Sequence, residues 1–138
     1  MANNSKPIGK GDDDAKALII ETLEGEWTGG FDLDSIYLIN QKYYILEFLK
    51  CETVRPNNSH PNRYWFKNNQ KFISLWEITK KLDGILYLVN YEDSRDQFKV
   101  IKVLKINETG ITDEISKEWN FSQFKSWFKE LNKKSLKS

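Results

Sequence analysis

The chain has 138 residues, of which 39% are hydrophobic and 14% aromatic, and its formal net charge is +1. This length and composition predict one folded domain and exclude a disordered chain, and the near-neutral charge excludes a protein that is basic throughout. No apolar run approaches the roughly 20 residues that cross a bilayer, residues 1–14 lack an apolar signal stretch, and Cys51 is the single cysteine, so we expect a cytoplasmic protein without a membrane partner or an internal disulfide.

The first half of the chain predicts an arm, a helix, a hairpin and a loop. Residues 1–12 are polar without periodicity, which is typical of a flexible arm. Apolar residues at three- and four-residue spacing predict a helix over residues 13–24. Two apolar runs at 33–40 and 43–52 flank a short polar turn and predict a β-hairpin. Residues 53–67 are rich in Pro and Asn and predict a loop.

The second half predicts a helix over residues 68–82, strands over 85–91 and 98–106, and a last helix over 120–132. Asn120 and Gln123 resemble a capping box at the start of that last helix. A basic tail over 133–138 follows.

The predicted order is therefore α-β-β-α-β-β-α, which indicates an α/β fold with a mixed β-sheet flanked by helices. The helix over 68–82 is a crossover connection, so we expect strands 43–52 and 85–91 to be parallel. Residues 13–132 form the single domain of this prediction.

Two carboxylates lie in or beside the predicted hairpin. Glu47 stands inside the apolar run 45–49, where burying a carboxylate is costly unless a metal, a cation or a hydrogen-bond donor compensates it. Asp34 precedes it by thirteen positions, and hairpin pairing would bring the two residues together. Lys50 follows close behind Glu47. These residues are the first candidates for a functional site.

Asp34, Glu47 and Lys50, in this order of elements, resemble the PD-(D/E)XK nuclease superfamily. That family has a helix, a strand with an Asp, a strand with Glu-x-Lys or Asp-x-Lys, a helix and another strand, and the resemblance covers residues 13–91. It implies a restriction-endonuclease-like core that hydrolyses phosphodiester bonds with Mg²⁺ or Mn²⁺. Asp34 and Glu47 would ligate the metal, Glu21 or Glu24 would add a ligand, and Lys50 would position the attacking water. The implied partner is nucleic acid, with DNA favoured over RNA, and a homodimer would bring a second active site to a duplex.

The spacing of the acid and the lysine departs from the family pattern. The family places them two residues apart, on one face of the strand, whereas Glu47 and Lys50 are three apart and project to opposite faces of a regular strand. Three alternatives follow. A β-bulge brings Lys50 round, Lys71 or Lys67 supplies the cation, or catalysis is lost and the fold serves as a binding or interaction module.

Both carboxylates also have structural interpretations. Asp34 could cap a turn before a strand. Glu47 could form a buried ion pair with Arg55, Arg63 or Lys71.

Residues 50–71 carry five basic residues against one Glu and mix them with amides and aromatic rings. Such residues hold phosphates, contact base edges and stack on unpaired bases. The candidates for nucleic-acid contact are Arg55, Arg63, Tyr64, Trp65 and Lys67. Alternatively, Trp65 and Phe66 anchor the loop in the core.

Other kinds of site have weaker signals. Cys51 and His60 alone are a poor basis for a thiol protease, and the chain has too few Cys and His residues for a zinc site built from nitrogen and sulfur ligands. A glycine-rich phosphate loop is absent from the sequence.

Overall fold

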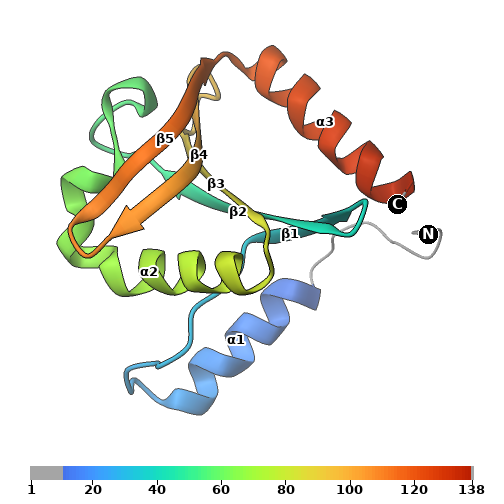
Figure 1. The fold of residues 1–138 in the computed structure, drawn as a ribbon. Helices are drawn as coiled ribbons and strands as arrows, with labels where there is room; N and C mark the ends of the chain where they lie inside the picture. Colours follow the sequence, from blue (N-terminus) through green and yellow to red (C-terminus); the bar gives the residue numbers. More distant parts are fainter. Residues whose placement is uncertain (1–10, 138) are drawn as a thin grey trace.

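The computed structural model describes residues 11–137 and has a five-stranded mixed β-sheet between two helices (Figure 1). The strands follow their chain order across the sheet: β1 (Ser35–Ile39), β2 (Lys42–Lys50), β3 (Ile85–Tyr91), β4 (Phe98–Asn107) and β5 (Gly110–Trp119). The helices are α1 (Gly11–Leu23), α2 (Trp65–Lys81) and α3 (Phe121–Lys137). Strands β2 and β3 are parallel and the other neighbouring pairs are antiparallel, which confirms the predicted hairpin and crossover.

The α/β class and the mixed sheet flanked by helices are confirmed, but the predicted order has one strand too few. Strand β5 was not predicted because most of its residues are exposed, so it carries no alternation of apolar and polar residues. It is held to the rest of the fold by backbone pairing with β4 and by Asn62, whose amide bonds the N–H and C=O groups of Ile111 at 2.8 and 3.0 Å.

Several predicted boundaries are wrong. The segment 53–67 is not a simple loop, because it contains two 3-10 turns, Pro56–Asn58 and Pro61–Tyr64, and α2 already begins at Trp65. Helix α3 continues to Lys137, so the basic residues predicted as a tail extend the helix. Of the predicted arm, residues 1–10 lie outside the described residues, and residues 11–12 belong to α1.

The predicted cap of α3 is confirmed. The Asn120 N–H donates to the Gln123 side-chain oxygen at 3.0 Å, and the Gln123 N–H donates to the Asn120 side-chain oxygen at 2.8 Å. This reciprocal pair satisfies two amide groups that a helix start leaves without partners.

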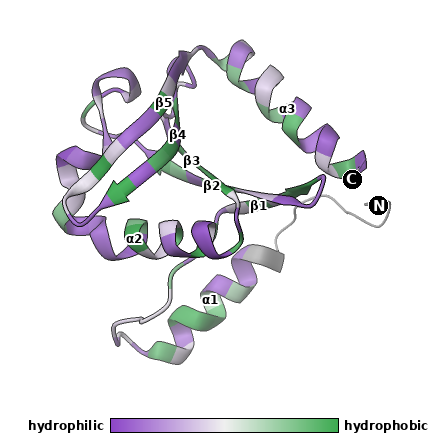
Figure 2. Cartoon of the chain, viewed as in Figure 1, coloured by the Kyte–Doolittle hydropathy of each residue, from purple (hydrophilic) through white to green (hydrophobic). Residues whose placement is uncertain are grey.

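The core has two parts, one on each face of the sheet, because successive strand side chains point to opposite faces. Under α2 the buried residues are Ile45, Trp65, Phe72, Leu75, Leu86, Leu88, Ile101, Val103 and Ile111. Under α3 they are Ile39, Leu46, Val89, Phe98, Val100, Phe124 and Leu131. Figure 2 shows hydrophobic residues interspersed with hydrophilic ones along the strands of the sheet.

Helix α1 differs from the other two helices. It contributes no described residue to either core cluster, and its apolar side chains Leu18, Ile19 and Ile20 are exposed. An ion pair between Lys16 and Asp32, at 3.0 Å, links it to the segment that leads into β1. Within residues 11–137, no helix has the length and apolarity needed to cross a membrane.

Candidate active site

Glu47 occupies the middle of β2, between β1 and β3, and only 1% of it is exposed. It shares the face of the strand with Ile45 and Leu49, which pack under α2. The strand alternation alone therefore directs this carboxylate into the interior between the sheet and α2. A charged group in that position needs a partner, since the interior solvates it poorly.

Lys71 is that partner. It lies in the second turn of α2, next to the buried Phe72, and its Nζ atom contacts Glu47 Oε2. The other carboxylate oxygen, Oε1, is buried and has no hydrogen-bond partner among the described residues. Glu47 thus combines one oxygen neutralised by an ammonium group with one oxygen that lacks a donor in this part of the chain.

Asp34 reaches the same site from the start of β1. Ser35 pairs with Leu46 in the hairpin, so the preceding residue lies beside Glu47. The Asp34 side chain also bonds the backbone of β2, because its Oδ2 atom accepts the Phe48 N–H at 2.9 Å. Asp34 is exposed, so the site extends from the buried Glu47 carboxylate to a carboxylate at the surface. The predicted proximity of the two carboxylates is confirmed.

Burial raises the pKa of Glu47 from its ordinary value of 4.5 to about 7. The contact with Lys71 opposes this rise, and the neighbouring charge of Asp34 adds to it. Near neutral pH, Glu47 is therefore divided between its protonated and ionised forms. A group poised in this way beside a second carboxylate is typical of functional sites, although structural ion pairs also shift pKa values.

Lys50 does not belong to this site. Strand β2 pairs with both neighbours in a continuous register, so no bulge turns Lys50 toward Glu47. Lys50 instead lies 3.1 Å from Asp93 and 3.8 Å from Glu52 at the exposed end of the strand. The lysine beside Glu47 comes from α2, which agrees with the second of the three alternatives for the cation and equally with the structural ion pair of Glu47 and Lys71 that the sequence left open.

Glu21 does not join the two carboxylates either. The described residues contain no group of three or more His, Cys, Asp or Glu side chains that could hold a metal ion, and Glu21 is an exposed residue of α1. Two carboxylates nevertheless suit Mg²⁺, which keeps several waters and is commonly bound by one or two carboxylates together with substrate phosphates. The unpartnered Oε1 atom of Glu47 beside Asp34 fits such a ligand set.

Three of the five residues predicted to contact nucleic acid have structural roles. The Arg55 guanidinium binds the buried Glu92 carboxylate through two contacts, at 3.1 and 2.7 Å. Trp65 is 3% exposed, donates its indole N–H to the Glu108 carbonyl at 2.9 Å and stacks on Phe72. Tyr64 packs against the same core cluster and remains half-buried, while Trp65 is closed to a base.

Arg63 and Lys67 are exposed, and with Lys71 they recur every four residues from the last 3-10 turn into α2. Lys67 and Lys71 are four residues apart within α2 and therefore share one side of the helix, with Lys71 at the carboxylates, whereas Arg63 lies before the helix and donates to the Asn58 carbonyl at 3.1 Å. Phe66, between them in sequence, is 93% exposed, so the expectation that it anchors the loop is wrong. The basic residues around Phe66 were the one signal in the sequence that its ring could be exposed.

Cys51 and His60 show no sign of nucleophilic chemistry. The His60 ring contacts the Glu114 carboxylate at 2.6 Å through Nε2, and its Nδ1 atom accepts the Asn62 N–H at 3.0 Å. Burial raises the pKa of the Cys51 thiol, whereas an activated thiol needs a lowered pKa.

Comparison with known proteins finds no matching family model, no matching curated protein and no matching solved structure. The resemblance to the PD-(D/E)XK superfamily therefore still rests on the residues themselves and on the order of the elements around them.

Proposed function

We propose that the protein hydrolyses phosphodiester bonds of nucleic acid with the help of Mg²⁺ or Mn²⁺, at a site formed by Asp34, Glu47 and Lys71. The observation that carries this proposal is the buried Glu47 carboxylate, which has Lys71 on one oxygen and an unpartnered second oxygen beside Asp34. A purely structural ion pair would be expected to satisfy both oxygens, because an unsatisfied buried acceptor costs about 1–3 kcal/mol. When Glu47 is ionised, an external cation at Oε1 would supply the missing partner.

Asp34 and Glu47 would hold the metal ion. When bound, the ion would polarise the phosphoryl group and lower the pKa of an attacking water. Glu47 ligates only as a carboxylate, so its raised pKa makes metal affinity increase with pH up to about 7. Metal binding and proton release are therefore coupled at this residue.

Lys71 has a different role from that of the two acids. Its contact with Glu47 Oε2 fixes the ammonium group at the edge of the site, where positive charge stabilises negative charge that develops on phosphoryl oxygens. In the family pattern the equivalent charge stands on the strand, and here it reaches the site from α2.

Arg63 and Lys67 extend this positive charge away from the carboxylates. Both are exposed, and they precede Lys71 in the sequence by eight and four residues. A phosphate backbone bound by Lys67 would bring a neighbouring phosphate toward Lys71 and the carboxylates, and the exposed Phe66 ring next to Lys67 in sequence is available for stacking. This arrangement supports a nucleic acid, rather than a small phosphate ester, as the substrate.

The test is cleavage of plasmid DNA, single-stranded DNA and RNA in the presence of Mg²⁺ or Mn²⁺. Glu47→Gln and Asp34→Asn keep the shapes of the side chains and should each lower the rate by at least about 100-fold, as is usual when an essential electrostatic group is removed. Lys50→Ala and Glu52→Gln are the matched controls, because they change a neighbouring lysine and acid outside the site, and they should retain activity. Circular dichroism and urea unfolding check that each variant is folded.

Cleavage that survives both Glu47→Gln and Asp34→Asn in folded protein would refute the assignment. A second candidate, a catalytically inactive binding module, is favoured by one observation: the described residues bring two acids together rather than three. It predicts no cleavage of any substrate, and calorimetry with Mg²⁺ separates the two, since binding that Glu47→Gln abolishes belongs to the metal-dependent enzyme.

A further inference from the structure

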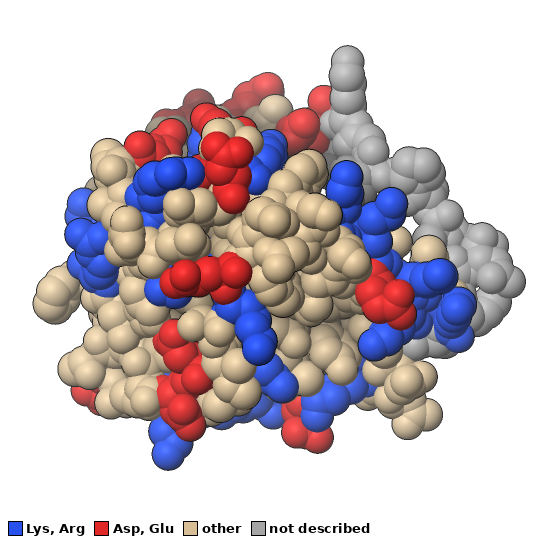
Figure 3. Space-filling model, turned by 90° about the horizontal axis from the view of Figure 1, so that it is seen from above, with Lys and Arg blue, Asp and Glu red and all other residues tan. Residues whose placement is uncertain are grey.

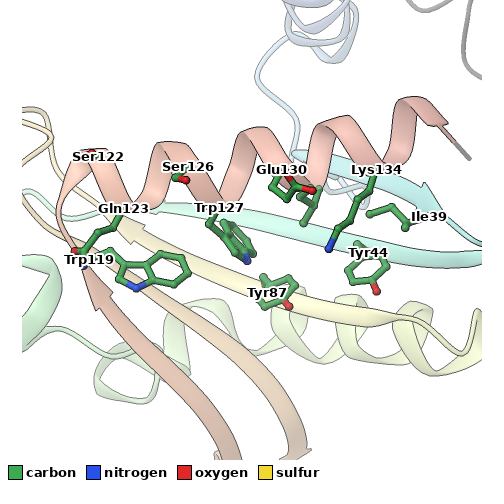
Figure 4. Close-up of a pocket in the computed structure, with 11 residues that line it drawn as sticks. Ile39, Tyr44, Tyr87, Trp119, Ser122, Gln123, Ser126, Trp127, Glu130 and Lys134 are labelled. Carbon is green, nitrogen blue, oxygen red and sulfur yellow. The ribbon is translucent and has the colours of Figure 1, made fainter.

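A second candidate site lies on the opposite face of the sheet from Glu47. Helix α3 and the strands beneath it border an open groove with a volume of about 780 Å³, within the range of about 300–1,000 Å³ that is typical of ligand sites. Four half-buried aromatic side chains line it in a row beneath the helix: Tyr44, Tyr87, Trp119 and Trp127 (Figure 4). These rings are neither fully packed into the core nor fully exposed.

The rings come from β2, β3, β5 and α3, so the row crosses three strand spacings, or about 14 Å. Trp127 stands at its centre, with ring centroids 5.0 Å from Tyr87 and 5.6 Å from Trp119. This length accommodates a few nucleotides of a single strand. A duplex keeps its bases stacked inside, so only unpaired bases could reach rings that are sunk beside a helix.

Polar groups form the other wall of the groove. Ser122, Gln123 and Ser126 line it along α3 (Figure 4). The Gln123 side-chain oxygen already accepts the Asn120 N–H, but an apolar partner, such as a helix of a second copy of this chain, would remove the two serine hydroxyls and the Gln123 NH₂ group from water, which is costly. A ligand with flat apolar faces and polar edges matches both walls, and nucleobases have that character.

The charge around the groove also favours an anionic strand. Lys134 lines the groove, Lys102 stands opposite Tyr87 in the strand register, and Lys117 lies two residues before Trp119 on the same face of β5. Glu130 is the acidic residue among the lining side chains. Seen from above, basic side chains gather where α3 ends, with acidic ones beside them (Figure 3).

We propose that this aromatic groove binds single-stranded nucleic acid, with bases stacked on its rings and phosphates near its lysines. The choice of nucleic acid as the ligand rests on the proposed function, whereas the groove itself is separate from the Glu47 site and lies across the sheet from it. The groove holds a strand independently of metal and of cleavage.

The experiment uses the full chain carrying Glu47→Gln, in EDTA, so that neither cleavage nor metal binding contributes. Fluorescence anisotropy follows labelled oligothymidylate and oligouridylate of about 12 nucleotides, with a duplex of equal length for comparison. Stacking of one base is worth about 1–3 kcal/mol, so Trp119→Ala should raise the Kd for single strands by about 5-fold to 150-fold. Trp27→Ala is the control, because Trp27 is 98% exposed and lies outside the groove.

The lysines give a second readout. Lys134→Gln should reduce the slope of log K against log salt concentration by about 0.7, the value for one phosphate contact on a single strand, whereas the exposed Lys81→Gln on α2 should leave the slope unchanged. A substitution that only disturbed folding would not change this slope by the amount that corresponds to one phosphate contact.

Three results would overturn the inference: equal Kd values for Trp119→Ala and Trp27→Ala, binding of the duplex at least as tight as that of the single strands, or a concentration-dependent dimer that Trp119→Ala dissociates, which would mean that a second copy covers the groove. If the parent protein cleaves no substrate but its binding depends on Trp119, the groove proposal stands and only the nuclease proposal is refuted. Cleavage without Trp119-dependent binding refutes only the groove.

Discussion

The raised pKa of Glu47 predicts an unusual dependence of stability on pH. In the unfolded chain this carboxyl group titrates near 4.5, and in the folded protein near 7. Between these values the folded state holds more protons than the unfolded state, so the free energy of unfolding falls as the pH rises. The stability that protonated Glu47 contributes is fully present below about pH 4.5 and is lost as the pH rises through about 7.

The size of the effect follows from the two pKa values. The difference between these pKa values, at about 1.4 kcal/mol per pKa unit, gives a total of about 3 kcal/mol, most of which falls between about pH 5 and about pH 8. Ordinary paired carboxylates show the opposite sign, because their pKa values are lowered on folding. The prediction therefore distinguishes a carboxylate dominated by burial from one dominated by its contact with Lys71.

The assay is urea unfolding, followed by tryptophan fluorescence in EDTA at a series of pH values, for the parent protein and for Glu47→Gln. The difference between the two free energies of unfolding isolates Glu47, because all other titrating groups are common to both proteins. We expect this difference to change by about 2–3 kcal/mol from about pH 5 to about pH 8, with the parent losing stability. A difference that stays constant within about 0.5 kcal/mol would refute burial as the dominant influence on the Glu47 carboxyl group.

Three further changes test other parts of the structure. Asp34→Asn removes a neighbouring negative charge, so the Glu47 midpoint in the same pH series should move below about 7, and an unmoved midpoint would mean that the two carboxylates do not interact. Asn120→Ala removes the cap of α3 and should lower the free energy of unfolding by about 1 kcal/mol in urea, whereas no loss would show that the cap is unimportant. Gly84→Ala would place a methyl group 2.7 Å from a main-chain oxygen of β2 and should cost about 1–3 kcal/mol, while Gly29→Ala, which meets nothing within 4 Å, should be neutral in the same measurement.

The hairpin and the crossover could be predicted from the sequence because their signals are local. Apolar runs separated by a short polar turn indicated β1 and β2, and the helical period before β3 indicated the crossover that makes β2 and β3 parallel. The same pairing placed Asp34 beside Glu47. A carboxylate inside an apolar run was a sufficient signal for the buried Glu47 at the centre of the candidate site.

The parts of the fold that could not be predicted depend on contacts between segments that are distant in sequence and on where α2 begins. Strand β5 is exposed on most of its length and is defined by its hydrogen bonds to β4, which leave no pattern of apolar residues. Trp65 and Phe66 are adjacent aromatic residues in the same basic stretch, yet one is buried and the other is exposed. Only the start of α2 at Trp65 decides between them, and helix ends are poorly marked when no capping side chain is present.

Packing explains why the lysine of the proposed site comes from α2 and not from the strand. The strand position that shares the face of Glu47 and follows it by two residues is Leu49, which packs against the core cluster beneath α2. A lysine there would need its own route to solvent from under the helix. Lys71 approaches Glu47 from the helix, so its stem lies over the core and its ammonium group reaches the carboxylate from the partly exposed side. The strand can then keep an apolar residue for packing while the site keeps its cation, and for this reason a three-residue spacing to Lys50 is no obstacle to the proposed chemistry.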